Sequence, residues 1–160
     1  MKKSSVVRLG CIGGGMIINV AHVPAYVELR DEVILTAIYS PEKNTAEETR
    51  KNYLEKMAQA GAKVDWEVTV CDSFEKLLTL VDAIDIGTPT RYHAWYAEKA
   101  LRAGVHAMSE KPIARNYLEA KRLTEVANSS KAIYQLNDDN VFLPRYQHIK
   151  NVLASGAIGE

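Results

Sequence analysis

The sequence predicts an α/β protein with a doubly wound, mainly parallel sheet of about six strands. Three observations lead to this fold class. Short apolar runs alternate with helix-forming stretches, the first run ends in a triple glycine, and the 160 residues suit one domain. Parallel neighbours need long crossover connections, and the stretches between the runs are long enough to provide them.

The apolar runs are typical of strands that are buried on both faces, because most of them lack strict alternation with polar residues. We expect strands at Val6–Ile12, Val33–Tyr39, Val68–Cys71, Ala83–Ile86, Val105–Met108 and Ala132–Leu136. No internal repeat or linker interrupts the series. The predicted domain therefore covers residues 1–160.

Helix start and stop signals mark the stretches between the runs. Helices are expected at Met16–Leu29, Pro41–Ala60, Phe74–Leu80, Tyr92–Ala103, Asn116–Asn128 and Val141–Ala154. Pro24 should kink the first helix, and Pro41 occupies a favoured first-turn position in the second. Ser73 is an expected N-cap, and Asn116 with Glu119 three residues later matches a capping box.

Composition and charge exclude several classes of protein. Lys plus Arg equals Asp plus Glu at 20 each, and the basic residues are scattered, so neither nucleic-acid nor membrane binding is expected. Cys11 and Cys71 both fall in predicted strands, which indicates buried, reduced thiols and a cytoplasmic location. No cysteine or histidine cluster has metal-ligand spacing, so no metal is expected.

The glycine turn after the first strand favours a dinucleotide cofactor. Gly13 and Gly15 stand where the first two glycines of the fingerprint would allow a tight turn and a close approach to a pyrophosphate. The helix that begins at Met16 and Ile17 offers free N–H groups to the phosphates. Ile18 replaces the third glycine and should push the helix slightly off the strand. A plain strand–helix connection is the alternative interpretation.

The exit of the second strand bears on the choice between NAD and NADP. Ser40 occupies the place where an aspartate would favour NAD, and Lys43 could pair with a 2′-phosphate. Glu42 argues the other way. The sequence predicts NAD or NADP, with a slight lean to NADP. Ser40 followed by Pro41 also matches a helix N-cap, and the two interpretations are compatible.

The tripeptide Glu110-Lys111-Pro112 directly follows the fifth expected strand. Proline disfavours the helical region for the preceding residue, so Lys111 should be held extended at a strand exit. An amine fixed there could donate or accept a proton. On its own, the tripeptide is more often a plain strand end at the surface.

Taken in order, several motifs resemble one known family. They are the glycine turn, His22-Val23-Pro24-Ala25, Thr88-Pro89-Thr90-Arg91-Tyr92-His93, the segment 100–106 and Glu110-Lys111-Pro112. This set is similar to the N-terminal domain of the glucose–fructose oxidoreductase/inositol dehydrogenase (Gfo/Idh/MocA) family, from about Val6 onward. The resemblance implies a Rossmann domain that binds NAD or NADP and acts on a sugar, a polyol or a related hydroxyl compound.

The resemblance also assigns roles to residues. Besides Gly13 and Gly15 at the pyrophosphate, the implied cofactor contacts are Thr88, Pro89, His93, Glu110 and Lys111. Lys111 would be the catalytic residue, because its amine would hydrogen-bond the reacting oxygen while hydride moves to or from the cofactor. For His93, a helix-capping role is the alternative, and His22 is expected to be structural.

The family's second α/β domain, with its substrate pocket, would follow Glu160 and is absent from the sequence. The segment Asn137–Phe142 also lacks an arginine that is common in the family. We therefore expect the chain to bind NAD(P) without turning over polyols, and association into a homo-oligomer stays open. The alternative is a stand-alone nucleotide-binding module, either a sensor or half of a split enzyme.

Overall fold

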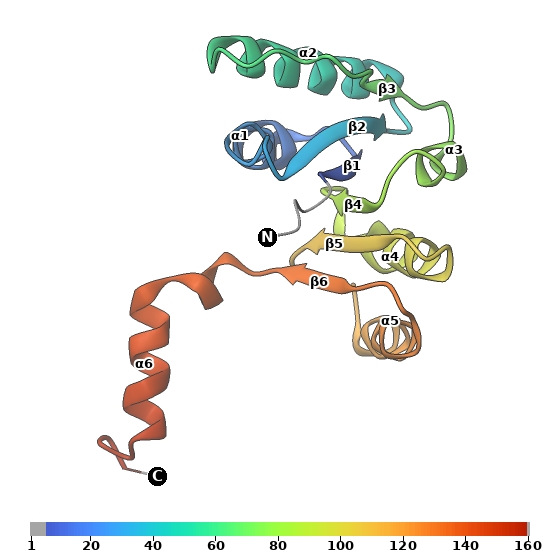
Figure 1. Cartoon of the computed structure of the whole chain (residues 1–160). Helices are drawn as coiled ribbons and strands as arrows, with labels where there is room; N and C mark the ends of the chain where they lie inside the picture. Colours follow the sequence, from blue (N-terminus) through green and yellow to red (C-terminus); the bar gives the residue numbers. More distant parts are fainter. Residues whose placement is uncertain (1–5, 160) are drawn as a thin grey trace.

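The structure, a computed structural model, describes residues 6–159 and contains one parallel sheet. Its strand order is β3-β2-β1-β4-β5-β6 (Figure 1). The strands are β1 (Val7–Ile12), β2 (Val33–Tyr39), β3 (Thr69–Val70), β4 (Ala83–Ile86), β5 (His106–Glu110) and β6 (Tyr134–Asn137). Every neighbouring pair is parallel, which confirms the predicted doubly wound sheet. The order reverses between β1 and β4, and this pair forms the topological switch point.

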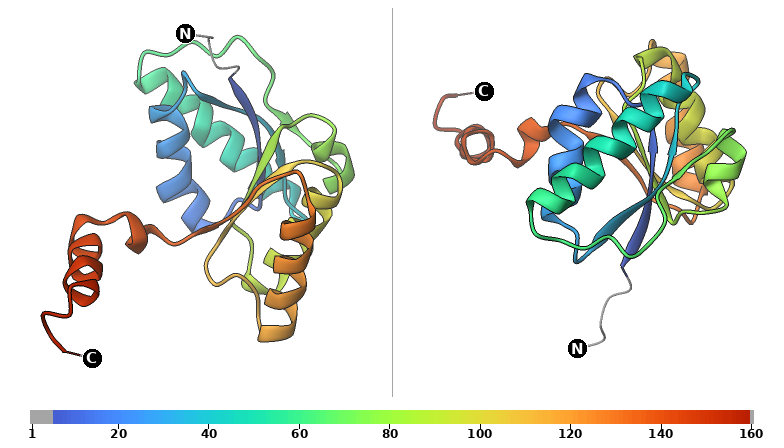
Figure 2. Two further views of the ribbon diagram at one scale, coloured as in Figure 1. Left: turned by 60° about the horizontal axis from the view of Figure 1, so that its bottom comes forward. Right: turned by 90° about the horizontal axis from the view of Figure 1, so that it is seen from above.

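Helices cover both faces of the sheet (Figure 2). They are η1 (Ile18–His22, a π-helix), α1 (Val23–Glu28), α2 (Lys43–Gln59), α3 (Phe74–Leu78), η2 (Thr90–Tyr92), α4 (His93–Arg102), α5 (Tyr117–Ser129), η3 (Asp139–Phe142) and α6 (Pro144–Ala154). Helices α1 and α2 lie on one face, and α3, α4 and α5 lie on the other. Helix α6 projects away from the sheet (Figures 1 and 2).

Two apolar clusters fill the layers between helices and sheet, because successive residues of a strand face opposite sides. In β4, Ile84 and Ile86 pack toward α3, α4 and α5, and both are fully buried. Ala83 packs instead with the cluster beneath α1 and α2. Asp85 shares the side of Ala83 by this alternation, so a carboxylate lies in a layer that is otherwise mostly apolar.

Most predicted elements exist, but only β2 and β4 begin and end where expected, and the other elements differ at one end or both. Helix α2 begins at Lys43, so Pro41 lies outside its first turn and that prediction was wrong. The final helix begins anew at Pro144, since proline suits the first turn but cannot continue the preceding one. The first helix contains the π-helical turn η1 just before Pro24. Strand β5 extends to Glu110, which places that residue inside the sheet.

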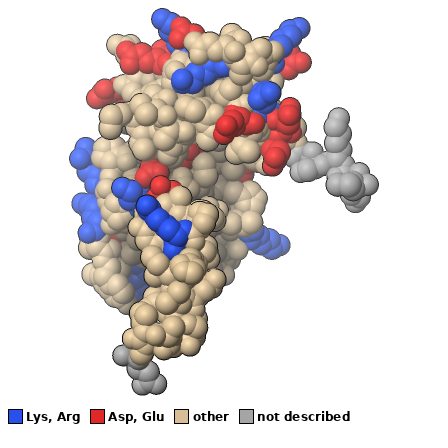
Figure 3. All heavy atoms as spheres, turned by 90° about the vertical axis from the view of Figure 1, so that its left-hand side faces the viewer, with Lys and Arg blue, Asp and Glu red and all other residues tan. Residues whose placement is uncertain are grey.

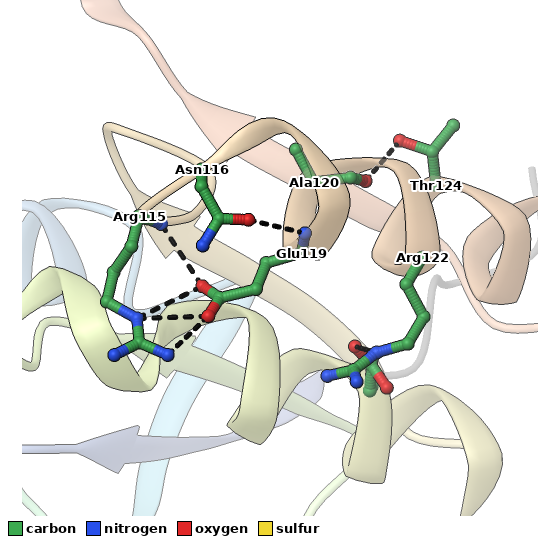
Figure 4. A network of polar contacts seen from close by, with 7 residues as sticks. Arg115, Asn116, Glu119, Ala120, Arg122 and Thr124 are labelled. Atoms are coloured by element: carbon green, nitrogen blue, oxygen red, sulfur yellow. Dashed lines mark hydrogen bonds and ion pairs between the residues drawn. The ribbon is translucent and has the colours of Figure 1, made fainter.

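The N-cap of α5 is partly as predicted (Figure 4). The Asn116 side chain accepts a hydrogen bond from the main-chain N–H of Glu119 at 3.0 Å. The Glu119 carboxylate, however, accepts hydrogen bonds from the main chain and guanidinium of Arg115, so the reciprocal bond of a capping box is replaced. Arg122 of α5 donates a hydrogen bond to Glu98 of α4 at 2.7 Å and ties the two helices together.

Charged side chains of both signs are interspersed on the face drawn in Figure 3. The projecting lower part of that face is largely uncharged. Among residues 6–159, no helix combines the length and the apolar character needed to cross a membrane.

Candidate functional site

A cleft of about 900 Å³ opens where the carboxyl ends of β4, β5 and β6 meet the start of the first helix. This is where ligands bind in open parallel sheets, beside the switch point. The sequence-predicted residues in its wall are Ile17, Thr88, Pro89, His93, Glu110 and Lys111. Residues 137–140 and Phe142 also line the cleft. The structure thus brings together residues that lie more than 100 positions apart in sequence.

The three glycines after β1 serve different purposes. Gly13 has φ +94°, a conformation that favours glycine, and its N–H donates to the Tyr39 carbonyl at 2.8 Å. A Cβ atom on Gly14 would lie 2.6 Å from Oγ1 of Thr49 in α2. A Cβ atom on Gly15 would meet no atom within 4 Å. Gly13 and Gly14 are therefore required by the fold, whereas Gly15 lines open space.

The helix start beyond Gly15 fits a pyrophosphate. Met16 and Ile17 are exposed, with 80% and 42% of their surface accessible. The N–H groups of a first helical turn have no acceptor within the helix. They could donate to phosphate oxygens on the open side of Gly15. The geometry is thus compatible with the predicted cofactor contacts at Gly13, Gly15, Met16 and Ile17.

Ile18, which stands in place of the third fingerprint glycine, is fully buried. It packs over Gly87 at the end of β4, where a Cβ atom would lie 2.4 Å from the Ile18 side chain. The missing side chain of Gly87 makes room for the isoleucine. Helix and sheet can therefore still approach closely, because the glycine lies at the end of β4 instead of in the helix.

Ser40 and Lys43 lie beyond the end of β2 and are not part of the cleft wall described above. The Ser40 hydroxyl accepts a hydrogen bond from the N–H of Glu42 at 3.3 Å. The Lys43 ammonium lies 3.1 Å from the carboxylate of Asp72, and both side chains are exposed. An anion at this strand end would therefore have to compete with Asp72 for Lys43.

His93 is buried beneath the cleft, with 1% of its surface exposed. Its Nδ1 lies 2.8 Å from the Pro112 carbonyl oxygen and its Nε2 lies 2.8 Å from the Thr88 carbonyl oxygen. The ring therefore joins the loop after β4 to the loop after β5. A neutral imidazole can donate to only one of the two carbonyls at a time.

Lys111 follows the last residue of β5, is exposed, and lines the cleft. The Lys111–Pro112 peptide bond is cis. Glu110 pairs with Asn137 of β6 across the sheet, and its side chain is 18% exposed. Among the residues that the structure describes, Lys111 takes part in no salt bridge.

Sequence reasoning missed a buried polar network behind Glu110. Asp85 has no exposed surface, and its Oδ2 lies 2.6 Å from Nδ1 of His22 and also accepts a hydrogen bond from the hydroxyl of Tyr26. Nε2 of His22 lies 3.2 Å from Oε1 of Glu110. Burial acts to lower the pKa of His22, but the hydrogen bond to Asp85 and the charges of Asp85 and Glu110 outweigh it, so the pKa is raised.

Burial and the nearby Asp85 charge raise the pKa of the Tyr26 hydroxyl and of the Cys11 thiol well above their usual values. Both groups therefore stay protonated near neutral pH. The available signal for this network was a single aspartate in the middle of an apolar strand. Within residues 6–159, no group of three or more His, Cys, Asp or Glu side chains is arranged to hold a metal ion.

A parallel doubly wound sheet with a glycine turn at its switch point defines the class of dinucleotide-binding Rossmann domains. Residues 7–138 match the family model described as the oxidoreductase family with an NAD-binding Rossmann fold (Gfo/Idh/MocA). The chain belongs to this family, as its motifs predicted.

Named relatives and solved structures support this membership. The chain is 34% identical over 80 residues to a dTDP-3,4-didehydro-2,6-dideoxy-alpha-D-glucose 3-reductase from Actinomadura kijaniata, covering 50% of this chain and 24% of that protein. It is 25% identical over 159 residues to D-glucoside 3-dehydrogenase from Escherichia coli, covering 98% of this chain and 42% of that protein.

Two solved structures resemble the whole fold. An oxidoreductase from Thermotoga maritima matches with a TM-score of 0.80 and 32% identity, covering 97% of this chain and 45% of that one. A 3-ketoreductase from Actinomadura kijaniata, solved with TDP-benzene and NADP, matches with a TM-score of 0.72 and 28% identity, covering 98% and 46%. This chain thus spans less than half the length of each of these four proteins.

Proposed function

We propose that residues 1–160 form the NAD(P)-binding part of an oxidoreductase that transfers hydride at a hydroxyl-bearing carbon of a sugar-like substrate. Family membership and the cleft at the switch point support this proposal. The reductase and the dehydrogenase named above act, by their names, on a sugar nucleotide and on a glucoside. Because this chain spans less than half of their lengths, selection of the substrate is proposed for the protein as a whole.

The single observation that carries the cofactor assignment is the open side of Gly15. The structure gives local packing reasons for Gly13 and Gly14, but a side chain on Gly15 would meet nothing. The backbone at Gly15 could approach a pyrophosphate closely, and the first helical turn would donate its N–H groups. A nicotinamide, when bound, would supply the hydride chemistry.

Lys111 is proposed as the catalytic residue. Oxidation of an alcohol releases the hydroxyl proton, and reduction of a ketone requires a proton for the new alkoxide. The amine of Lys111 would take or give that proton, and as an ammonium it would stabilise the developing negative charge. Thr88, Pro89 and His93 line the same cleft and would border the cofactor, and Glu110 would lie beside Lys111.

Gly15→Ala is the sharpest test of the cofactor site. The added methyl group meets no protein atom, so we expect unchanged thermal stability together with a loss of NADPH affinity of about tenfold or more. Gly14→Ala is the matched control, because its methyl group would collide with Thr49 and lower stability. Titration of the intrinsic fluorescence with NADPH and NADH measures the affinity. Binding of both cofactors to Gly15→Ala as tightly as to the wild type would contradict the proposal.

NADP is the preferred cofactor of this proposal, because Ser40 leaves room for a 2′-phosphate and Lys43 lies nearby. The Actinomadura kijaniata 3-ketoreductase was solved with NADP. Ser40→Asp should reverse the preference toward NADH, since a carboxylate repels a phosphate. Asp72→Asn should strengthen NADPH binding by releasing Lys43 from its ion pair. Tighter binding of NADH than of NADPH by the wild type would overturn the preference.

Cys11 and Cys71 are both buried free thiols. Thiols of this kind suit a reducing compartment, so the cytoplasm remains the proposed location.

A further inference from the structure

Burying the Asp85 carboxylate costs free energy, and its place in β4 gives no reason for a carboxylate there. Asp85 pairs with Cys11 of β1 and Met108 of β5, and the groove on this side of the sheet is lined mainly by apolar side chains. Burial of an ionised carboxylate is unfavourable unless it is paired and hydrogen-bonded. An apolar residue at this position would avoid that cost. We therefore expect the role of Asp85 to lie in the contacts that its carboxylate makes.

His22 meets a carboxylate at each ring nitrogen. Its Nδ1 faces Asp85 at 2.6 Å and its Nε2 faces Glu110 at 3.2 Å. Ionised carboxylates only accept hydrogen bonds, so both contacts are made together only by the doubly protonated imidazolium. The His22 side chain is 12% exposed and lies in the wall of the cleft. The protonated ring therefore places a positive charge between the buried Asp85 and Glu110, at the rim of the proposed catalytic site.

The contact with Glu110 decides which role His22 has. If His22 served only to neutralise Asp85, its second nitrogen could face solvent in the cleft. It faces instead the carboxylate next to Lys111 in sequence. This contact holds the Glu110 side chain on the side of the first helix. Glu110 makes no ion pair with Lys111 among the described residues, so the lysine amine remains available to a ligand.

We propose that His22, held by Asp85, is a positioning residue that fixes the Glu110 carboxylate on the inner wall of the cleft and leaves the Lys111 amine free for the substrate. The inference rests on the proposed function, because the value of a free Lys111 depends on the hydride-transfer site. Loss of the His22 proton would remove one hydrogen bond of the Asp85–His22–Glu110 network and release Glu110. Cofactor and substrate binding would then weaken as the pH rises.

Other ionisable groups around the network must be considered in any pH experiment. Ionisable groups face His22 from three elements: Asp85 from β4, Glu110 from β5 and Tyr26 from α1. Cys11 of β1 lies beside Tyr26 and Asp85. The further ionisable groups that line the same cleft are His93, Lys111, Asp138 and Asp139. Variants at His22 and Glu110 separate this network from the remaining groups.

The first experiment needs no cofactor. Nuclear magnetic resonance of the histidine rings follows the titration of His22 in the wild type, in Glu110→Gln and in Asp85→Asn. We expect a lower His22 pKa in both variants, because each removes a negative charge that faces the ring. His148→Gln, on the projecting helix α6, is the control and should leave the titration unchanged. A His22 pKa that is the same in Glu110→Gln and the wild type would overturn the proposal, since the ring would then serve Asp85 alone.

The second experiment measures NADPH affinity between about pH 6 and pH 9. We expect the affinity of the wild type to fall by about fivefold or more as His22 loses its proton. His22→Gln and Glu110→Gln should give flat profiles, because the glutamine of the first variant cannot lose a proton and the second variant offers no carboxylate for His22 to hold. Val27→Ala, a core substitution in α1, should lower stability and keep the wild-type profile.

A wild-type pH profile in a folded Glu110→Gln protein would contradict the proposal even if His22→Gln failed to fold. If neither NADPH nor NADH binds at any pH, the proposed function fails. The resonance experiment still decides the coupling between His22 and Glu110 in that case.

Discussion

Replacing Gly87 with alanine places a methyl group against Ile18. The new Cβ atom would lie 2.4 Å from both Cγ1 and Cδ1 of Ile18. Carbon atoms in contact are normally about 3.5–4.0 Å apart, so a gap of roughly 1 Å or more has to open. Ile18 is fully buried, and Cγ1 lies close to the backbone, so rotation of the side-chain end cannot relieve both contacts. Overpacking of this kind costs about 1–3 kcal/mol, and we expect the upper half of that range.

The two partners should compensate for each other. Ile18→Ala alone should lower the free energy of unfolding by about 2–5 kcal/mol, because it leaves a cavity over Gly87. In the double variant I18A/G87A, the new methyl group enters that cavity. The double variant should therefore be more stable than the sum of the two single effects predicts, by about 1–3 kcal/mol.

Urea unfolding at 25 °C, followed by tryptophan fluorescence, gives these free energies by linear extrapolation. Gly15→Ala is the control, because a methyl group there meets no atom within 4 Å. Additive effects of the two substitutions, within about 0.5 kcal/mol, would refute the proposed packing of Ile18 on Gly87.

Three further predictions concern stability and titration. Asn116→Ala should cost about 1 kcal/mol in urea unfolding, because α5 loses its N-cap, whereas the exposed Asn128→Ala near the other end should cost less than about 0.5 kcal/mol. The raised pKa of His22 stabilises the fold fully below its unfolded value of about 6.5, and this contribution disappears as the pH rises through the higher folded value. The stability advantage of the wild type over His22→Gln should therefore shrink from about pH 6.5 upward in urea unfolding. Burial, together with the nearby Tyr39, raises the pKa of Tyr96 to about 12, so its ring resonance should titrate after that of an exposed tyrosine.

Much of the fold follows from local patterns in the sequence. Strands β2 and β4 begin and end as predicted, because apolar, β-branched runs between turn residues have few other solutions. Helix starts were harder to predict, since Pro41 and Pro144 are both acceptable in a first turn, but only Pro144 begins a helix in the structure. The choice between the two depends on the packing of neighbouring elements, which a local pattern does not contain.

The candidate site also has a part that local motifs predicted and a part that they missed. Lys111 and the loop after β4 were predicted because their motifs are contiguous in sequence, and the structure places them around one cleft. The His22 network was missed because the partners of His22 are 63 and 88 residues away and lie on two different strands, β4 and β5. Asp85 was the one local clue, since a charged residue within an apolar strand must find a partner.

Ile18 shows why the glycine fingerprint is incomplete as a local motif. The third glycine of the fingerprint lets a helix pack closely on a strand, and this requirement concerns a pair of surfaces. A glycine on either surface can meet it. Here Gly87 at the end of β4 provides the space, so an isoleucine can occupy the helix position and bury its side chain. A sequence that lacks the third glycine should therefore be searched for a small residue at the end of the neighbouring strand before a dinucleotide site is rejected.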